Sequence, residues 1–474
     1  MSATTSTSLL QRGVASNTVC NKINDYQIVL GDINGLELSN TNIKQFLIEE
    51  DIFSLLPSLC FDIVDAGSLF NSGDMYVGQT LYVQFAPMKM FNTETKITTY
   101  TSMRMKIVSI INTHSNTNST TVYHVTCVYD ALGVLGSVHP YPPKSNATVT
   151  DTLAKESSVN AIKAQLNAGG LDAVSDIATS DSMIWINTRN KVYQAVNKFL
   201  NHSWVAEDDA LLAYTSFVND KSFDDKSSTD DIKEAFTKHA TITSCNTLKS
   251  KSSEATYIPA KLKGEHANCI RFANATVKGC GGITTIANDA YKQVEYTYDP
   301  LGILNTDEMY DFTTADTSVS NNLTQQKTCY GMLKRVFDNP EVSMASNGSK
   351  IDTLYNYTNV ITDCGIHFPN TTHAYYDVAP AHNKAVIASF FSTAIDIIFD
   401  VNQQSEEVLK SNALPYIGQK VTLDCSESDD EISENYSGDY IVAQIKYNIY
   451  NNEPALCVLT LIADGTYKKP TLTK

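Results

Sequence analysis

The sequence is poor in charged residues, above all in positive ones. Only 18% of its 474 residues are charged, and 35 Lys and Arg stand against 52 Asp and Glu, for a formal net charge of -17. Soluble proteins usually carry about 25% charged residues. Nucleic-acid binders need a basic face that displaces counterions from phosphates, so this balance argues against sequence-specific nucleic-acid binding. Apolar residues still make up 42% of the chain, which predicts a folded protein with an uncharged, polar surface.

Long hydrophobic runs are also missing. No stretch approaches 18 apolar residues, and the first residues lack the apolar core of a secretory signal. We therefore expect a soluble protein without a membrane span, made in a cytoplasm. At roughly 150 residues per domain, the length predicts about three domains.

The cysteines form no metal-binding or redox pattern. None belongs to a C-x-x-C pair, and none has a histidine at metal-ligand spacing. We expect reduced, buried thiols in preference to disulfides or zinc ligands. The ten positions are Cys20, Cys60, Cys127, Cys245, Cys269, Cys280, Cys329, Cys364, Cys425 and Cys457.

Established catalytic motifs are absent: there is no Gly-x-Ser-x-Gly elbow, P-loop, Gly-x-Gly-x-x-Gly or His-Glu-x-x-His. The run 279–282 (Gly-Cys-Gly-Gly) lacks a following Lys-Ser/Thr, which favours a bulge or turn over a phosphate cradle. Cys364 and His367 are neighbours in sequence, which is not the spatial pairing of a nucleophile and its base. The acidic run 427–431 with Glu434 lacks the spacing of a calcium loop and favours a solvated hairpin tip. We expect no catalytic, cofactor-binding or metal-binding residues, and no enzyme.

The first part of the chain has the texture of strands. Residues 1–24 are rich in Ser and Thr and predict a flexible N-terminal arm. Residues 25–143 predict a first β-barrel, because short segments enriched in β-branched and aromatic residues are separated by turn-forming clusters. The expected strands are 26–31, 60–65, 80–85, 105–111 and 121–130.

Residues 144–253 predict an inserted α/β region after a proline cluster. A helix is expected over 149–168, capped by Thr150 or Asp151 and stopped by Gly169–Gly170.

A second helix in this insert is capped by Thr188 in our interpretation. Its apolar residues recur at three-and-four spacing: Val192, Val196, Phe199 and Leu200. Strands over 203–205 and 211–218 are expected to flank the acidic turn 207–209, and 219–233 an exposed loop. Trp185 and Trp204 are expected to be core or interface aromatics.

The rest of the chain predicts a second barrel with its own insertion. Residues 254–300 begin it, with strands from 255 and over 294–298. Residues 301–382 form an inserted mixed segment with a helix over 323–337, stopped by Pro340. Residues 383–474 complete the barrel as a final β-rich region.

An internal repeat supports two copies of one β-module. The segment 76–85 (Tyr-Val-Gly-Gln-Thr-Leu-Tyr-Val-Gln-Phe) matches 416–425 (Tyr-Ile-Gly-Gln-Lys-Val-Thr-Leu-Asp-Cys). Each copy follows a strand and precedes a β-pair. These elements are 60–65 with 105–111 and 121–130 in the first copy, and 395–400 with 440–450 and 455–465 in the second.

The repeat makes two predictions. Gly78 and Gly418 are expected to need positive φ or close backbone approach, so that Gly78→Val or Gly418→Val would damage assembly. In a three-fold ring, two similar modules per chain would give six similar units.

At these residues the chain resembles the central baseplate hub proteins of contractile-tailed bacteriophages, with tail-tube-like barrels. The likeness lies in segment 65–85, in helix 189–200 with Trp204 and strand 211–218, and most clearly in 436–445 and 458–465. It covers 26–220 and 383–470, whereas 300–382 does not fit it.

The resemblance implies a homotrimer whose barrels form a pseudo-hexameric ring in the virion tail. Such a ring adapts the six-fold tail tube, or its initiator, to a three-fold central spike and lines the DNA exit channel during genome ejection. The implied partners are the tube, the spike, the tape measure protein and the baseplate wedge proteins, with assembly in the host bacterial cytoplasm. An acidic lumen would release DNA, but acidity could equally serve solubility.

Two other classes stay open. A tail-associated hydrolase would need a paired acid and base that does not emerge. A surface or adhesion glycoprotein would use the many Asn-x-Ser/Thr sequons, which an Asn-, Ser- and Thr-rich chain also creates by chance. These sequons lie at Asn118, Asn146, Asn201, Asn274, Asn322, Asn347, Asn356, Asn370 and Asn435. Host, tail type, the face that meets the spike and the role of 301–382 are left open.

Overall fold

The computed structural model describes strands and helices on both sides of a long central interval. The described residues are 24–31, 36–38, 43–65, 73–87, 101–113, 121–142, 155–206, 209–216, 239–260, 269–280, 393–400, 415–425, 436–450, 456–463 and the single positions 373, 375, 376, 379, 383, 386, 387 and 390.

Strands dominate this part of the chain, which confirms the expected mostly β fold with an inserted α/β region. The strands before the insert are β1 Asn24–Leu30, β2 Leu36–Leu38, β3 Ile43–Asp51, β4 Ser58–Asp65, β5 Thr80–Pro87, β6 Thr101–Thr113 and β7 Thr121–Tyr129. The strands after it are β11 Ala255–Pro259, β12 Cys269–Phe272, β13 Asn274–Cys280, β14 Thr393–Asp400, β15 Lys420–Leu423, β16 Gly438–Tyr450 and β17 Leu456–Ala463.

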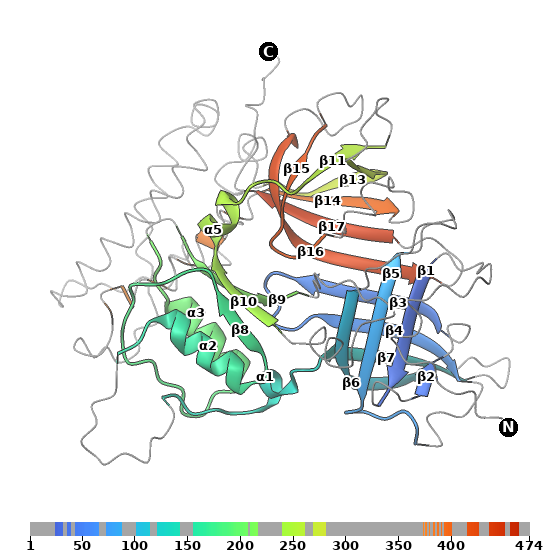
Figure 1. Cartoon of the computed structure of the whole chain (residues 1–474), viewed down its shortest axis with the longest axis horizontal. Coiled ribbons are helices and arrows are strands. Elements are labelled where there is room, and N and C mark those ends of the chain that lie inside the picture. The colour runs from blue at the N-terminus through green and yellow to red at the C-terminus, as the bar shows by residue number, and fades with distance from the viewer. Residues whose placement is uncertain are drawn as a thin grey trace, which may run out of the picture.

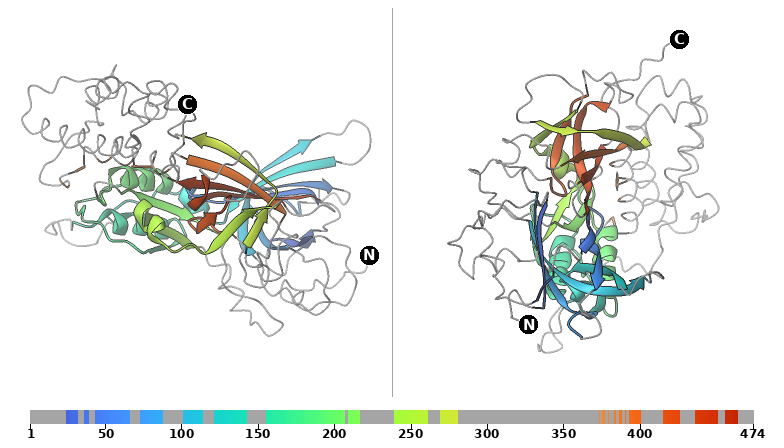
Figure 2. Two further views of the ribbon diagram at one scale, coloured as in Figure 1. Left: turned by 90° about the horizontal axis from the view of Figure 1, so that it is seen from above. Right: turned by 90° about the vertical axis from the view of Figure 1, so that its right-hand side faces the viewer.

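These fourteen strands form one continuous sheet (Figure 1). The main path runs β12-β11-β15-β16-β3-β4-β7-β6-β5-β1-β2, while β13, β14 and β17 branch from β16. Almost all neighbours are antiparallel; β11 is parallel to both β12 and β15. The sheet curls instead of lying flat (Figure 2), and buried positions alternate with less buried ones along its strands.

The same five-strand order occurs twice in this sheet. In the first half the order is β3-β4-β7-β6-β5. In the second half it is β13-β14-β17-β16-β15. We call these sets the first and second halves of the sheet. The topology therefore contains the duplication that the sequence repeat predicts, whereas the domain boundaries stay predictions.

The α/β region consists of a small sheet with helices against it. Its sheet has the order β8-β10-β9, with β10 parallel to β8 and antiparallel to β9. Helices α2 and α3 pack on each other and contact this sheet. The elements are α1 Leu132–Gly136, α2 Ser158–Ala168, β8 Asp172–Ser175, α3 Val192–His202, β9 Leu211–Thr215, β10 His239–Ser244 and α5 Cys245–Ser250.

Both long helices begin later than expected. Helix α2 starts at Ser158 and not at 149, because Ser157 is its cap and the buried Asp181 carboxylate accepts a hydrogen bond from the Ser158 amide at 3.0 Å. Gly169 and Gly170 end it as predicted. Helix α3 is capped at Lys191 instead of Thr188, since the Gln194 side chain accepts a hydrogen bond from the Lys191 amide. Val192, Val196 and Phe199 of its apolar stripe are buried, and Leu200 is partly buried.

One strand prediction is wrong. Residues 203–205 form no strand, because the Ser203 and Trp204 amides bond to Leu200 and to the Asp181 carboxylate, so neither joins a sheet. The expected strand 395–400 is confirmed as part of β14, and Asn383, Val386 and Phe390 before it are helical.

Several expectations lie outside the described residues. They are the arm 1–23, the loop 219–233, the strand 294–298, the helix 323–337 and most of the segment 301–382.

Candidate assembly interface

The two sequence-matched turns have the same backbone geometry. Gly78 has φ 94° and Gly418 has φ 80°, in the left-handed region that favours glycine. The Gly78 amide donates to the Ile107 carbonyl at 2.8 Å, and the Gly418 amide donates to the Val442 carbonyl at 2.9 Å. The predicted positive φ at both glycines is confirmed.

The adjacent glutamines repeat the pattern. The Ile107 amide donates to the Gln79 carbonyl at 3.0 Å, and the Val442 amide donates to the Gln419 carbonyl at 2.9 Å. The backbone amide of each glutamine also donates to the carbonyl three residues earlier, at Tyr76 or Tyr416, and this bond closes the turn. Ile107 and Val442 are therefore equivalent positions of β6 and β16.

Strand register extends this equivalence across both halves. In the first half Cys127 lies opposite Leu59 and Ile107, and in the second half Leu461 lies opposite Ile395 and Val442. The register of β6 against β7 shifts just after Ile107, and that of β16 against β17 shifts just after Val442. A β-bulge thus occurs at the same place in both copies. Leu59 is therefore the structural counterpart of Ile395. Matching 60–65 with 395–400 from their first residues would instead pair Cys60 with Ile395, so the sequence match differs from the structure by one residue.

The two halves meet where β3 pairs with β16, and we call this pairing the intrachain seam. Gln444 to Tyr450 lie antiparallel to Asp51 to Gln45 in unbroken register. The Ile52 amide extends the ladder by donating to the Ala443 carbonyl at 2.8 Å. The other part of β16, Gly438 to Ile441, pairs with β15 along the same edge. One long strand therefore belongs to the second half and also holds the first.

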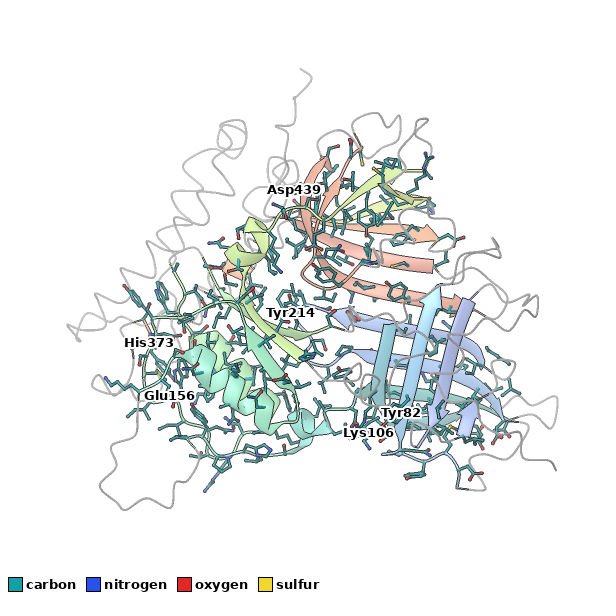
Figure 3. The ribbon with its side chains drawn as sticks, viewed as in Figure 1. Tyr82, Lys106, Glu156, Tyr214, His373 and Asp439 are labelled. Atoms are coloured by element: carbon teal, nitrogen blue, oxygen red, sulfur yellow. The ribbon has the colours of Figure 1, made fainter. Side chains whose placement is uncertain are left out.

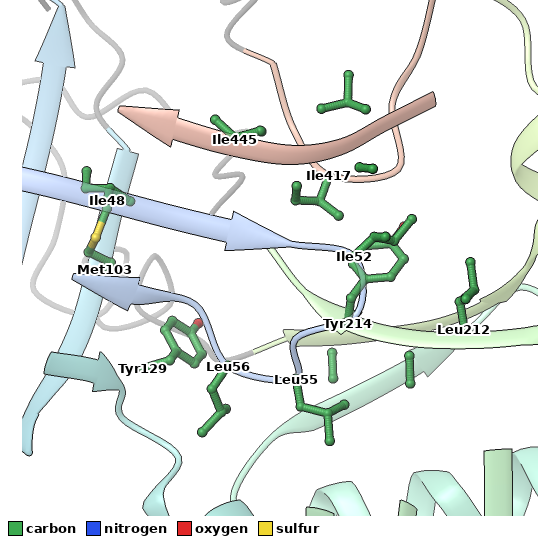
Figure 4. Close-up of a cluster of buried hydrophobic side chains, with 14 of the residues drawn as sticks. Ile48, Ile52, Leu55, Leu56, Met103, Tyr129, Leu212, Tyr214, Ile417 and Ile445 are labelled. Carbon is green, nitrogen blue, oxygen red and sulfur yellow. The ribbon is translucent and has the colours of Figure 1, made fainter. Parts of the chain in front are cut away.

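The apolar side chains on one face of the intrachain seam are buried. Phe46, Ile48, Ile445 and Ile449 are each at most 1% exposed. Figure 4 shows Ile48 and Ile445 in the cluster that joins the two halves. Full burial of side chains of this size stabilises the fold by roughly 1.5–3 kcal/mol each, so apolar packing is the main force at this junction.

The polar side of the intrachain seam carries charge pairs and amides. Lys446 Nζ lies 3.0 Å from Glu49 Oε1. The Gln444 amide nitrogen donates to Glu49 Oε1 at 2.9 Å and to Asp51 Oδ2 at 3.2 Å. Gln45 donates to Asn448 at 3.3 Å. Burial raises the pKa of Asp51 above its ordinary value. These contacts fix the register of the seam.

A buried carboxylate lies beside the intrachain seam. Glu50 is 5% exposed, and the Ser216 hydroxyl donates to its Oε2 at 3.1 Å. Burial, reinforced by the nearby Glu50 charge, raises the pKa of Tyr129, and burial likewise raises the pKa of Tyr447 and of Cys457 well above their usual ranges. The Tyr129, Tyr447 and Cys457 side chains therefore stay protonated at neutral pH and line a structural core.

The α/β region is tied to both halves at this junction. The Thr215 hydroxyl donates to the Leu55 carbonyl at 2.7 Å, in the turn between β3 and β4. Tyr214 lies where the small sheet meets the large one (Figure 3), next to Ile52 and Ile417 (Figure 4). A Cβ added at Gly418 would lie 3.0 Å from Tyr214 Cζ. All three parts of the fold are in contact here.

Of the candidate chemical residues, only Gly279 and Cys280 lie within the described ranges. Gly279 follows a register shift of β13, so the expected bulge is confirmed there. Cys364, His367 and the acidic residues 427–434 lie outside the described residues. Within the described ranges, no group of three or more His, Cys, Asp or Glu side chains is placed to hold a metal.

The described thiols are free and protonated. Cys127, Cys245, Cys425 and Cys457 are buried, while Cys60 and Cys269 are partly exposed. Burial raises the pKa of Cys245 and of Cys425 to about 12. A thiol acts as a nucleophile in its thiolate form, so none of these six has an activated environment.

The two tryptophans are buried in the α/β region, as expected. Trp185 is 3% exposed, donates to the Glu156 carbonyl at 3.0 Å and meets the Phe199 ring edge-on. Trp204 is 6% exposed and stacks on Tyr375 with ring centroids 4.1 Å apart. Both residues are core aromatics.

The strand that forms the intrachain seam, β3, was not among the expected strands. Its alternation runs Phe46, Ile48, Glu50 on the buried side, and the buried Glu50 hides that pattern in a run of acidic residues. The apolar residues Ile43, Phe46 and Ile48 are the part of the sequence that could have indicated this strand.

Comparison with known proteins gives only distant likenesses. No family model matches the chain, and no curated protein matches it. No helix in the described ranges is both long and apolar enough to cross a membrane.

The solved structures that this chain resembles weakly include proteins of tails and of a secretion system. A tail protein of Neisseria meningitidis MC58 is 10% identical, with a TM-score of 0.42, over 93% of this chain and 96% of that one. The 43 kDa tail protein of prophage MuSo2 from Shewanella oneidensis is 7% identical, with a TM-score of 0.44, over 93% and 97%. A type VI secretion component of E. coli, described as similar to bacteriophage T4 tail proteins, is 6% identical, with a TM-score of 0.40, over 91% and 77%. At this level of likeness the functional argument rests on the chain's own geometry.

Proposed function

We propose that this protein is a non-enzymatic structural hub of a phage tail baseplate. In this role three copies form a ring with six similar units, which adapts the six-fold tail tube to the three-fold central spike. The ring lines the channel through which DNA leaves the virion.

The observation that carries the proposal is the repeated strand order and register of the two halves. A six-fold partner presents six equal binding positions, which three identical single-module subunits would fill only by half. Two modules per chain resolve the mismatch, because three chains then present six similar edges. The residue-level match of the Gly78 and Gly418 turns supports a common origin for the two modules.

Composition is in line with this role. A net charge of -17 repels the phosphates of a passing DNA chain, so a ring of this charge would release its cargo. The tail tube or its initiator, the spike, the tape measure protein and the baseplate wedge proteins are the partners in this proposal, and the virion tail is its location. The sequence-based alternatives, an adhesion glycoprotein and a tail-associated hydrolase, gain no support from the described residues.

Mass determination of the purified full chain tests the proposal. Analytical ultracentrifugation at tens of micromolar is expected to give a species of three times 52.1 kDa, and negative-stain images are expected to show a ring. A strict monomer under these conditions would overturn the hub. Glycan mass on native material would favour the adhesion protein instead, and turnover of cell-wall or peptide substrates the hydrolase.

A further inference from the structure

The two equivalent long strands, β16 and β6, differ in how much of one edge is paired with other strands. Along one edge, β16 pairs with β15 through Gly438 to Ile441 and with β3 through Gln444 to Tyr450. Along the equivalent edge, β6 pairs with β5 through Thr101 to Lys106. Beyond that point, no strand in the described ranges pairs with this edge of β6.

The counterpart of β3 is also open on one side. Ile48 of β3 lies opposite Leu59, and Val277 of β13 lies opposite the equivalent Ile395. On its other edge β3 holds β16, whereas β13 has only β14 as a partner among the described strands. The described strands therefore contain one filled seam and the two separate edges of an equivalent seam that no described strand fills.

Exposure agrees with this difference. Tyr447 is 6% exposed in the intrachain seam, whereas Asn112, at the equivalent position of β6, is exposed. Its neighbour Ile111 is 54% exposed. On β13, Asn274 and Thr276 are exposed. These edges therefore leave backbone groups and apolar surface available for a partner.

Charged side chains and prolines, two of the usual blocks to pairing, are nearly absent from both edges. Natural edge strands are blocked by charged side chains, prolines or short length. Residues 107–113 (Ile-Val-Ser-Ile-Ile-Asn-Thr) contain no charge and no proline, and 274–280 (Asn-Ala-Thr-Val-Lys-Gly-Cys) contain a single lysine. Such edges are suited to β-strand addition.

We propose that β6 of one copy pairs antiparallel with β13 of the next copy, which repeats between chains the β3–β16 seam found within each chain. The inference rests on the proposed ring and specifies its interface. Tyr447 lies opposite Ile48 and Asn448 opposite Leu47 in the intrachain seam. The equivalent interchain pairs are Asn112 with Val277 and Thr113 with Thr276.

The partner of each edge is a second copy of this chain, because the β6 edge and the β13 edge are unlike surfaces. Contact between unlike surfaces of identical chains is heterologous, and it leaves no unpaired edge only when the chains close into a ring. Each copy then offers one β6 edge and one β13 edge, so all edges of these two kinds are filled. A two-fold dimer that pairs like surfaces would not contain the β6–β13 pairing.

Cysteine cross-linking of the full chain tests the register. The double variants are Asn112→Cys with Val277→Cys, and Thr113→Cys with Thr276→Cys. Directly opposite Cβ atoms in an antiparallel pair are about 4.5–5.5 Å apart. Successive opposite pairs alternate between hydrogen-bonded and non-hydrogen-bonded sites, so one of the two double variants is placed for a disulfide.

Under mild oxidation, at least one double variant is expected to give covalent dimers and trimers on a non-reducing gel. The four single variants measure the background from the native cysteines. Thr113→Cys with Lys163→Cys is the matched control, because Lys163 is an exposed residue of α2, in the α/β region and on neither edge. Interchain cross-links from the control at the same yield would overturn the proposal.

The outcomes separate this inference from the ring itself. A trimeric mass without cross-links from either double variant overturns the β6–β13 pairing and leaves the hub in place. Cross-links that build open-ended chains, or rings of another size, keep the pairing and overturn the three-fold hub.

Hydrogen exchange on the wild-type assembly keeps the inference testable if a variant does not fold. Those amides of 109–113 and 274–277 that point away from β7 and β14 are expected to be protected as well as the amides of 444–450 that bond to β3. Exchange of these outward amides at the rate of unstructured chain would overturn the pairing.

Discussion

At the scale of single residues, Gly78 and Gly418 share a conformation and differ in surroundings. Both have positive φ, where a Cβ costs roughly 1–2 kcal/mol. A Cβ at Gly78 would have no described atom within 4 Å, but one at Gly418 would meet the Tyr214 ring and Leu248 Cδ2 at 3.3 Å. The second glycine thus serves a turn and also a close contact between the α/β region and the sheet.

Alanine at the two positions is expected to separate these effects. Gly78→Ala should lower the free energy of unfolding by about 1–2 kcal/mol, from backbone strain alone. Gly418→Ala should lower it further, by about 1–3 kcal/mol, because the new methyl group overpacks against Tyr214. Denaturant unfolding followed by circular dichroism measures both values.

Tyr214→Phe is the matched control for this comparison. Removing the phenol oxygen should recover part of the Gly418→Ala loss and none of the Gly78→Ala loss, as a double-mutant cycle would report. Equal losses at the two glycines, unchanged by Tyr214→Phe, would contradict the close contact. The conformation of both glycines was predictable from the repeated Gly-Gln pair, whereas the Tyr214 contact was not, because it joins residues about 200 positions apart.

At the scale of elements, the intrachain seam combines two kinds of contact of unequal weight. Ile445 is 1% exposed and fills the apolar side. The Lys446 and Glu49 side chains are 38% and 34% exposed, so solvent screens their attraction. The stability of the seam should therefore depend on packing, and its register on the polar side.

Neighbouring alanine substitutions in β16 test this ranking. Ile445→Ala should lower the free energy of unfolding by about 2–5 kcal/mol. Lys446→Ala should lower it by less than about 1 kcal/mol. Chemical denaturation of the two variants beside the wild type gives the comparison; a larger loss for Lys446→Ala would reverse the assignment.

Local pattern predicted the elements in which it was undisturbed. Strands β4, β5 and β7 alternate where their burial is described, β6 alternates as far as Ile107, and all four were expected within a few residues of their observed limits. The seam strand β3 was missed because tertiary packing buries Glu50 on its apolar side, against the usual preference of carboxylates for solvent. Helix α2 starts late because its first free amide is satisfied by Asp181, which lies 23 residues further along the chain.

At the scale of the whole molecule, one hydrophobic core runs through both halves of the sheet and the α/β region. The same cluster of buried residues includes Ile63, Phe199 and Leu461, one from each part. The intrachain seam and the Tyr214 contact lie where these parts meet. The parts should therefore not unfold independently.

A single cooperative unfolding transition is expected for the described fold. Both tryptophans, Trp185 and Trp204, lie in the α/β region, so their fluorescence reports on that region, whereas far-ultraviolet circular dichroism reports mainly on the large sheet. The two signals should give coincident transition curves.

Ile445→Ala extends this test to the seam. The variant should lower both midpoints together, since its effect reaches the α/β region through the shared core. A fluorescence transition that precedes the circular dichroism transition, or that is unmoved by Ile445→Ala, would contradict the common core.

The long separation between the two seam strands affects how the protein is made. Gln45 and Asn448 bond across 403 positions of sequence. At about 5–20 residues per second, the ribosome adds β16 roughly 20–80 s after β3. During that time the edge of β3 lacks its eventual partner in the nascent polypeptide. Neighbouring ribosomes on one messenger carry chains at the same stage, so a translation pause before residue 438 would prolong the period in which such edges can aggregate.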